Sequence, residues 1–191
     1  MLRDRSFPVA DADKIAREVQ SPGHRAFQRI VERFGASILA SDGLIDRRAL
    51  GRLIFDDAVA RTDLNRIVHP AIAQRSAATF MQWKQAGHRL GFYDAALLFE
   101  TGSFAQFPLV VVVAAPTDLQ LQRIASRDPD LSETEAMARI QAQMPLEEKV
   151  AKADIVIHND ADLACLEKRV EMALVQIHDR LSLSYEGTRH G

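Results

Sequence analysis

Two carboxylates lie two residues apart near the start of the chain, at Asp11 and Asp13. A carboxylate beside a hydroxyl can accept its proton while the oxygen attacks an electrophile. The apolar segment 7–10 is typical of a short strand, and the segment 14–20 is typical of a helix. In α/β proteins the carboxyl ends of strands are where ligands bind. Either aspartate could instead cap the helix, and the spacing alone does not decide between these roles.

A third carboxylate, Asp94, follows a mostly apolar segment that begins at Leu90. This arrangement resembles the carboxylate that holds Mg²⁺ in nucleotide-dependent enzymes. Many strands end in an aspartate that forms a turn, so this signal taken alone favours a turn. The hypothesis for Asp94 is an indirect role near a metal ion.

Three arginines could bind phosphate oxygens. Arg123 and Arg127 lie one turn apart in one expected helix, and Arg139 lies in the next. The alternative is a solvated basic face paired with nearby carboxylates, which are Asp118, Asp128 and Asp130. The residue types alone favour this alternative.

His69, next to Pro70 in a long helical segment, could contact a substrate or serve the helix structurally. The histidines and the single cysteine, Cys165, show no spacing typical of metal ligands, so we predict no zinc site. None of the 9 glycines is followed by lysine. The sequence therefore contains no Gly-Lys-Ser/Thr loop of the kind that holds the β- and γ-phosphates of a nucleotide.

The elements that must position these residues alternate between strands and helices, which predicts an α/β fold with a mostly parallel sheet. The apolar run 109–113 is the clearest strand, and its unbroken character predicts burial on both faces. Further strands are expected within 90–99 and at 155–157. Helices are expected at 24–34, from Asp46, over 57–87 with an interruption or kink at Pro70, at 117–127, from Ser132 to Met144, and over 163–183, with a frayed tail at 184–191.

Composition narrows the function classes. The 191 residues predict one domain, and the net charge of −2 gives no electrostatic reason to expect a nucleic acid or membrane partner. The longest apolar run, 109–115, is too short to cross a bilayer as a helix. A single cysteine excludes an intramolecular disulfide and fits a cytoplasmic location. The oligomeric state does not follow from the sequence.

Taken in order, segments along nearly the whole chain resemble the dephospho-coenzyme A kinase family. The matching segments are 7–19, 33–35, 41–47, 50–55, 64–70, 94–102, 139–140, 143–145, 148–149 and 153–159. Each is modest, but their order and spacing make a chance similarity implausible. One small departure is Ala96, where the family usually has proline.

The resemblance implies a three-layer fold of the P-loop kinase type, a mostly parallel sheet flanked by helices. It implies a single domain with a core, a helical substrate-binding insertion and a helical lid over ATP. The core would comprise 1–56, 88–116 and 153–183, the insertion 57–87 and the lid 117–152.

The activity implied is ATP-dependent phosphorylation of the ribose 3′-hydroxyl of dephospho-CoA, the last step of coenzyme A synthesis, with ATP and Mg²⁺. Asp13 resembles the catalytic base, and Asp11 its companion near the metal and phosphates. The other implied site residues are His69 and Arg66 for the substrate and Arg123, Arg127 and Arg139 for the ATP lid.

The beginning of the chain departs from the family. The family starts with a central strand, the phosphate loop and a helix, whereas residues 1–5 fit only the last turns of that helix. Each buried backbone group left unpaired by a missing central strand would cost about 1–3 kcal/mol, against a net stability of about 5–15 kcal/mol. We therefore expect Met1 to be an internal methionine of a longer native protein, a hypothesis that the upstream nucleotide sequence would test. The 191-residue form is then expected to be inactive. The alternative is a non-catalytic relative that binds a CoA-like ligand.

Overall fold

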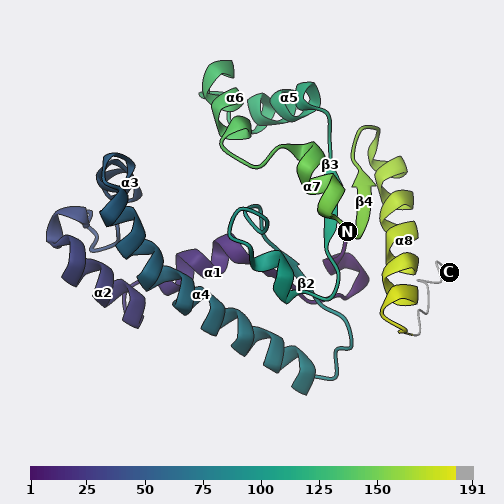
Figure 1. The fold of residues 1–191 in the computed structure, drawn as a ribbon, viewed down its shortest axis with the longest axis horizontal. Helices are drawn as coiled ribbons and strands as arrows, with labels where there is room; N and C mark the ends of the chain where they lie inside the picture. The colour runs from purple at the N-terminus through teal and green to yellow at the C-terminus, as the bar shows by residue number, and fades with distance from the viewer. Residues whose placement is uncertain (184–191) are drawn as a thin grey trace. The chain divides into compact units, whose positions relative to one another are not determined.

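The computed structural model describes residues 1–183, so the predicted tail lies outside the described part of the chain. These residues form two compact units, one from Leu2 to Ala96 and the other containing the residues from Leu97 onward. In the described residues each unit has one two-stranded parallel sheet, accompanied by helices (Figure 1). The predicted α/β class with parallel strands is confirmed.

In the first unit, β1 (Val9–Asp11) pairs in parallel with β2 (Phe92–Asp94). The register places Val9 opposite Phe92 and Asp11 opposite Asp94. Helix α1 (Ala12–Val19) begins directly after β1, because the Asp11 side chain caps it. Its apolar positions Ile15 and Val19 are buried in the core of this unit.

The other helices of the first unit are η1 (Arg3–Arg5), α2 (Arg25–Phe34), η2 (Ala36–Ile38), α3 (Arg47–Asp56) and α4 (Ala58–Gln85). Helix α2 ends at Phe34 and α3 starts after Asp46, both as predicted. Gly35 ends α2 with φ 79°, and the Asp46 side chain caps α3. Helix α4 runs through Pro70 without interruption, so the break that we allowed for there does not occur. It packs against α1, α2 and α3.

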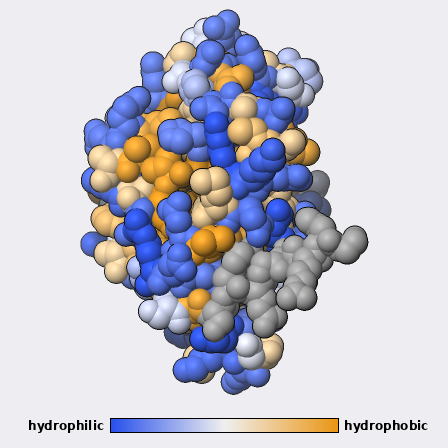
Figure 2. All heavy atoms as spheres, turned by 90° about the vertical axis from the view of Figure 1, so that its right-hand side faces the viewer, coloured by the Kyte–Doolittle hydropathy of each residue, from blue (hydrophilic) through white to orange (hydrophobic). Residues whose placement is uncertain are grey.

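In the second unit, β3 (Val111–Ala114) pairs in parallel with β4 (Ile155–His158), and α8 (Leu163–Arg180) packs against β4. The prediction that the valine-rich strand is buried on both faces is wrong. Val112 and Ala114 are buried, but the side chain of Val113 is 58% exposed. Figure 2 shows one face of the molecule, on which hydrophobic residues lie among hydrophilic ones.

Helices α5 (Thr117–Arg127) and α6 (Glu133–Gln141) pack against each other as a hairpin. Ser132 and Glu135 form a capping box that starts α6, because each side chain accepts a hydrogen bond from the other residue's backbone N–H. After α6 the chain forms α7 (Leu146–Lys152), which we did not predict. The short η3 (Ser103–Gln106) lies earlier in the chain, before β3. Among the described residues, no helix is both long and apolar enough to span a membrane.

Candidate functional site

The carboxyl ends of β1 and β2 bring two of the predicted residues together. Asp11 and Asp94 are register partners, each the last residue of its strand. Adjacent strands lie about 4.8 Å apart, so the two residues share one small region of the sheet edge. Asp94 is exposed, and Asp11 is half-buried.

Asp11 and Asp13 have different structural roles. Asp11 is the N-cap of α1, where its Oδ1 accepts a hydrogen bond from the Lys14 N–H at 3.0 Å. Asp13 lies in the first turn of α1, and its side chain is exposed. The Asp13 side chain makes no hydrogen bond or ion pair with another described residue. Of the two carboxylates, that of Asp13 is therefore the one that the helix start does not use.

A bridge between two helices fixes α1, and sequence reasoning missed it. The Glu18 Oε1 atom of α1 accepts a hydrogen bond from Arg75 Nε of α4 at 2.7 Å. Arg75 also donates to Thr79 Oγ1 at 2.9 Å, which orients the guanidinium along α4. Both partners were visible as charged residues on helices, but nothing local in the sequence relates position 18 to position 75.

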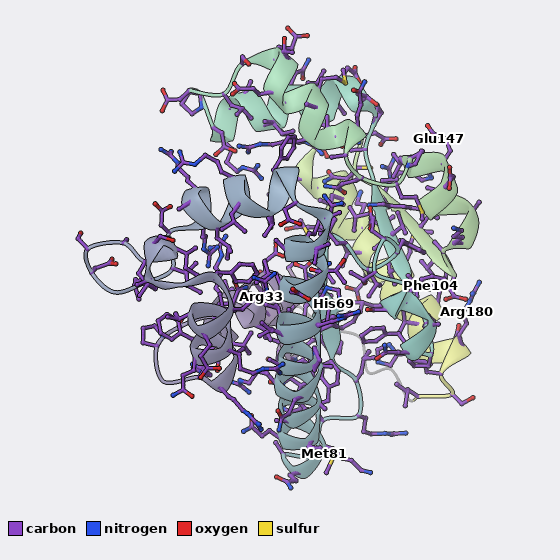
Figure 3. The ribbon with its side chains drawn as sticks, turned by 60° about the vertical axis from the view of Figure 1, so that its left-hand side comes forward. Arg33, His69, Met81, Phe104, Glu147 and Arg180 are labelled. Carbon is purple, nitrogen blue, oxygen red and sulfur yellow. The ribbon has the colours of Figure 1, made fainter. Side chains whose placement is uncertain are left out.

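The predicted substrate-binding residues His69 and Arg66 lie on α4, the helix that packs against α1. Figure 3 shows His69 along this helix. Both side chains are exposed. Arg66 Nη1 lies 3.7 Å from Asp63 Oδ1, and Arg33 Nε donates to the other oxygen of Asp63 at 2.8 Å. No hydrogen bond joins His69 or Arg66 to Asp11, Asp13 or Asp94 among the described residues.

The three candidate phosphate-binding arginines share one hairpin. Arg127 Nη2 lies 3.1 Å and Arg139 Nη1 3.7 Å from the same oxygen, Asp128 Oδ2. All three arginines are exposed. The basic face paired with aspartate, which we gave as the alternative, thus occurs for Arg127 and Arg139. A phosphate group that binds Arg127 and Arg139 would have to displace Asp128 or share their guanidinium groups with it.

Arg123 is held differently, by the loop that follows β4. Its Nη2 donates to Asn159 Oδ1 at 3.2 Å, and the Asn159 N–H donates to the Ala114 carbonyl at 2.7 Å. Arg169 donates to both the His158 carbonyl and Asp160 Oδ1. The hydrogen bond from Arg169 lowers the pKa of the Asp160 carboxyl, and the same bond raises the pKa of Arg169. The loop is therefore anchored on α8.

Asp11 and Asp94 are the candidate carboxylates for a metal ion. Within the described residues no three His, Cys, Asp or Glu side chains form a ready metal cage. Two carboxylates at adjacent strand ends, Asp11 and Asp94, fit the Mg²⁺ pattern in which one or two protein carboxylates act together with substrate phosphates.

A second missed feature is a hydrogen-bonded cluster at Glu100. Its Oε1 accepts from Lys149 Nζ and from the Met144 N–H, both at 2.8 Å. Burial by itself would raise the pKa of the Glu100 carboxyl, but these two hydrogen bonds, together with one from its own backbone N–H and the positive charge of Lys149, hold that pKa below its ordinary value. The only sequence signal was a set of charged residues in the segments 94–102 and 148–149.

Comparison with known proteins identifies the family. The family model described as dephospho-CoA kinase matches residues 1–164. The dephospho-CoA kinase of Syntrophotalea carbinolica is 45% identical over 163 residues, which are 85% of this chain and 77% of that protein. That of Anaeromyxobacter dehalogenans is 41% identical over 177 residues, 93% of this chain and 83% of that protein.

Two solved structures share the fold. "Crystal structure of TT1252 from Thermus thermophilus" has a TM-score of 0.76 at 31% identity and covers 92% of this chain and 87% of its own. The dephospho-CoA kinase from Campylobacter jejuni has a TM-score of 0.66 at 29% identity, with coverage of 93% and 88%.

The parallel strands and these structural neighbours define the P-loop kinase fold, that of a class of phosphotransferases. The family follows from the sequence matches. The chain belongs to the dephospho-CoA kinase family, whose members act in coenzyme A biosynthesis.

Proposed function

We propose that this chain supplies the acceptor-binding and proton-accepting part of an enzyme that transfers the γ-phosphoryl group of ATP to the ribose 3′-hydroxyl of dephospho-CoA. The observation that supports this most directly is the division of roles between Asp11 and Asp13. Asp11 satisfies the start of α1, which leaves Asp13 exposed two residues after the end of β1. A base must be able to reach the hydroxyl that it deprotonates.

In the proposed reaction, Asp13 accepts the proton of the 3′-hydroxyl while that oxygen bonds to the γ-phosphorus. The bond from the γ-phosphorus to the bridging oxygen breaks, and ADP leaves with that oxygen. Asp11 and Asp94 would hold Mg²⁺, which neutralises phosphate charge. We assign acceptor binding to His69 and Arg66, and neutralisation of phosphate charge to Arg123, Arg127 and Arg139.

The same proposal assigns a role to each region of the chain. We assign the acceptor to the helical segment 57–87 and the nucleotide lid to 117–152, with the core formed by 1–56, 88–116 and 153–183 as one functional domain. A cytoplasmic location stays a prediction.

None of the 9 glycines in these 191 residues is followed by lysine. The residues present therefore do not supply the Gly-Lys-Ser/Thr cradle that holds β- and γ-phosphates in kinases of this fold. We propose that the 191-residue polypeptide binds dephospho-CoA but does not turn it over. ATP-dependent formation of coenzyme A by this polypeptide at a rate typical of enzymes would contradict this proposal.

Calorimetric titration tests the binding half of the proposal. Dephospho-CoA should bind to the folded 191-residue chain, and the double variant Arg66→Gln/His69→Ala should bind it more weakly. Arg89→Gln, another exposed arginine of the same unit, is the matched control. A folded chain that shows no heat of binding with dephospho-CoA would overturn the assignment of the acceptor.

The missing Gly-Lys-Ser/Thr sequence also favours a second candidate function, a non-catalytic module that binds a CoA-like ligand. That module should bind coenzyme A at least as tightly as dephospho-CoA and should not bind ATP. Adding the strand and phosphate loop of a dephospho-CoA kinase to the N-terminus separates the two candidates. The enzyme hypothesis expects such a chimera to form coenzyme A, whereas the binding module would remain inactive.

A further inference from the structure

A single carboxylate holds the connection between α6 and α7. Glu100 Oε1 accepts hydrogen bonds from the Met144 N–H and from Lys149 Nζ, both at 2.8 Å. Lys149 Nζ also donates to Gln143 Oε1 at 3.0 Å. The backbone at Met144 and the side chain of Gln143 are therefore fixed by the same two charged groups, one from the loop before β3 and one from α7.

This pair is shielded from water far more than the ion pairs of the hairpin. The side chain of Lys149 is 12% exposed and that of Glu100 is 21% exposed. In the Arg127–Asp128 pair the corresponding values are 72% and 41%. Phe99, next to Glu100, is buried, and an apolar cluster surrounds it. The cluster includes Leu98, Phe104, Phe107, Met144, Leu146 and Val150. The Glu100–Lys149 pair should therefore be screened less by water than the Arg127–Asp128 pair.

The α5–α6 hairpin depends on its two ends for its orientation. The two helices pack mainly against each other, whereas α7 packs against β3. At the entrance to α5, Gln120 Nε2 donates to the Ala115 carbonyl at 2.8 Å, and Arg123 bonds to Asn159. At the exit, the bonds of Glu100 hold Met144, a few residues beyond Arg139. The bonds at this exit therefore contribute, with those at the entrance, to the orientation of α6 within the unit.

We propose that Glu100 and Lys149 are positioning residues that fix the exit of the α5–α6 hairpin and so determine where Arg139 is presented. Only the purpose of this role, which is to place an arginine for phosphate binding, rests on the proposed function. The geometric claim concerns the second unit alone and holds whether or not the chain binds dephospho-CoA.

Distances between two spin labels, measured by pulsed electron paramagnetic resonance, test the geometric claim. Thr134→Cys on α6 and Lys168→Cys on α8 are both exposed positions. The native thiol is removed by Cys165→Ala. In this background we expect one narrow distance distribution. Glu100→Ala, which removes the acceptor of both bonds, should broaden the distribution and shift its mean. Lys149→Met, which leaves the Met144 bond possible, should give a smaller change in the same direction.

Two comparisons separate positioning from a general loss of stability. Arg180→Gln removes the exposed Arg180–Asp154 pair of the same unit and should leave the distribution narrow. The charge-reversed variant Glu100→Lys/Lys149→Glu restores an ion pair but gives Met144 no acceptor at position 100, so it should stay broad. Circular dichroism establishes that each variant is folded. If Glu100→Ala does not fold, Lys149→Met decides the question.

An unchanged distribution in folded Glu100→Ala, or in Lys149→Met where that variant decides, would overturn the proposal. Equal broadening in Arg180→Gln would also overturn it. Loss of dephospho-CoA binding in the calorimetric experiment would leave these distances unaffected, so the two proposals fail separately.

Discussion

Asp11 and Asp94 stand opposite each other at the carboxyl ends of two parallel strands, although they lie far apart in the sequence. The strand that ends in Asp11 also leads directly into α1, so Asp13 follows within the same turn of chain. One strand end therefore carries a capping carboxylate, an exposed carboxylate and a neighbouring carboxylate from β2.

Asp13→Asn should abolish phosphoryl transfer without changing stability. In a chimera that carries the phosphate loop of a dephospho-CoA kinase, we expect kcat to fall by about 10²–10⁴-fold, because an amide cannot accept the proton. The free energy of unfolding in urea should stay unchanged, since Asp13 is exposed. Asp118→Asn, at the equivalent position in the first turn of α5, is the control and should keep full activity. A chimera whose kcat is unchanged by Asp13→Asn would exclude Asp13 as the base.

Gly91→Ala should destabilise the first unit. An added Cβ would lie 2.5 Å from Trp83 Cε3 and 2.7 Å from Cζ3, so the indole ring, which packs against Phe80, must shift. We expect a loss of about 1–3 kcal/mol, the usual range for overpacking. Urea unfolding, followed by the fluorescence of Trp83, measures this loss of stability. Trp83 is the chain's single tryptophan.

The matched control for that experiment is Gly51→Ala. Gly51 lies inside α3, and a Cβ there would meet no other atom within 4 Å. Removing a glycine from a helix interior should stabilise the protein by up to about 1 kcal/mol. If both variants changed stability in the same direction, the contact between Gly91 and Trp83 would not be the cause.

Glu100 should make the protein sensitive to acid. Its hydrogen bonds outweigh burial and place the pKa of the folded state below the ordinary value of 4.5. A carboxyl with a depressed pKa stabilises the fold above its unfolded pKa, and this contribution is lost as the pH falls through the folded pKa. Wild type should therefore exceed Glu100→Gln in stability at pH 7, and the difference should shrink below about pH 4.5.

Thermal unfolding between pH 7 and pH 3 follows this difference. The control is Glu147→Gln, an exposed glutamate of α7 that makes no hydrogen bond or ion pair with the described residues. Its stability curve should run parallel to that of wild type. A difference between wild type and Glu100→Gln that stays constant through the acid range would show that the ionised carboxylate is not what matters.

Asp128→Asn should strengthen the binding of a polyphosphate. Asp128 lies within ion-pair distance of both Arg127 and Arg139, so it competes with a phosphate for the same guanidinium groups. Titration with tripolyphosphate at low salt should show tighter binding in Asp128→Asn and weaker binding in Arg139→Gln. Added salt should reduce both affinities, because exposed charges are screened. Identical affinities in all three proteins would favour a merely solvated basic face.

Local signals predicted the helices and their starts well. Gly35 ends α2, Asp46 caps α3, and Ser132 with Glu135 starts α6. Each of these depends on a few neighbouring residues, so one sequence suffices to find them. Helix α7 was missed because Pro145 starts a new helix close to the end of the previous one.

Long-range partners could not be predicted in the same way. The sequence shows that Glu18, Arg75, Glu100 and Lys149 are charged residues, but it does not indicate their partners. The pairing of Glu18 with Arg75, and of Glu100 with Lys149, depends on how the elements pack. Likewise, an unbroken apolar run indicated a strand, but only its packing shows that Val113 is exposed. For the candidate site, the sequence left Asp11 and Asp13 equivalent, and the structure assigns the cap to Asp11.

Pro70 gives the longest helix a turn of low bending stiffness. It has no N–H, so the carbonyl of Arg66, four residues earlier, lacks its usual helical donor. Elsewhere along the 28 residues of α4, bending the axis would strain intact backbone hydrogen bonds, whereas here one is already missing. This turn also carries Arg66 and His69. A ligand that draws these two side chains toward itself can therefore curve the helix at the point where deformation requires the least work.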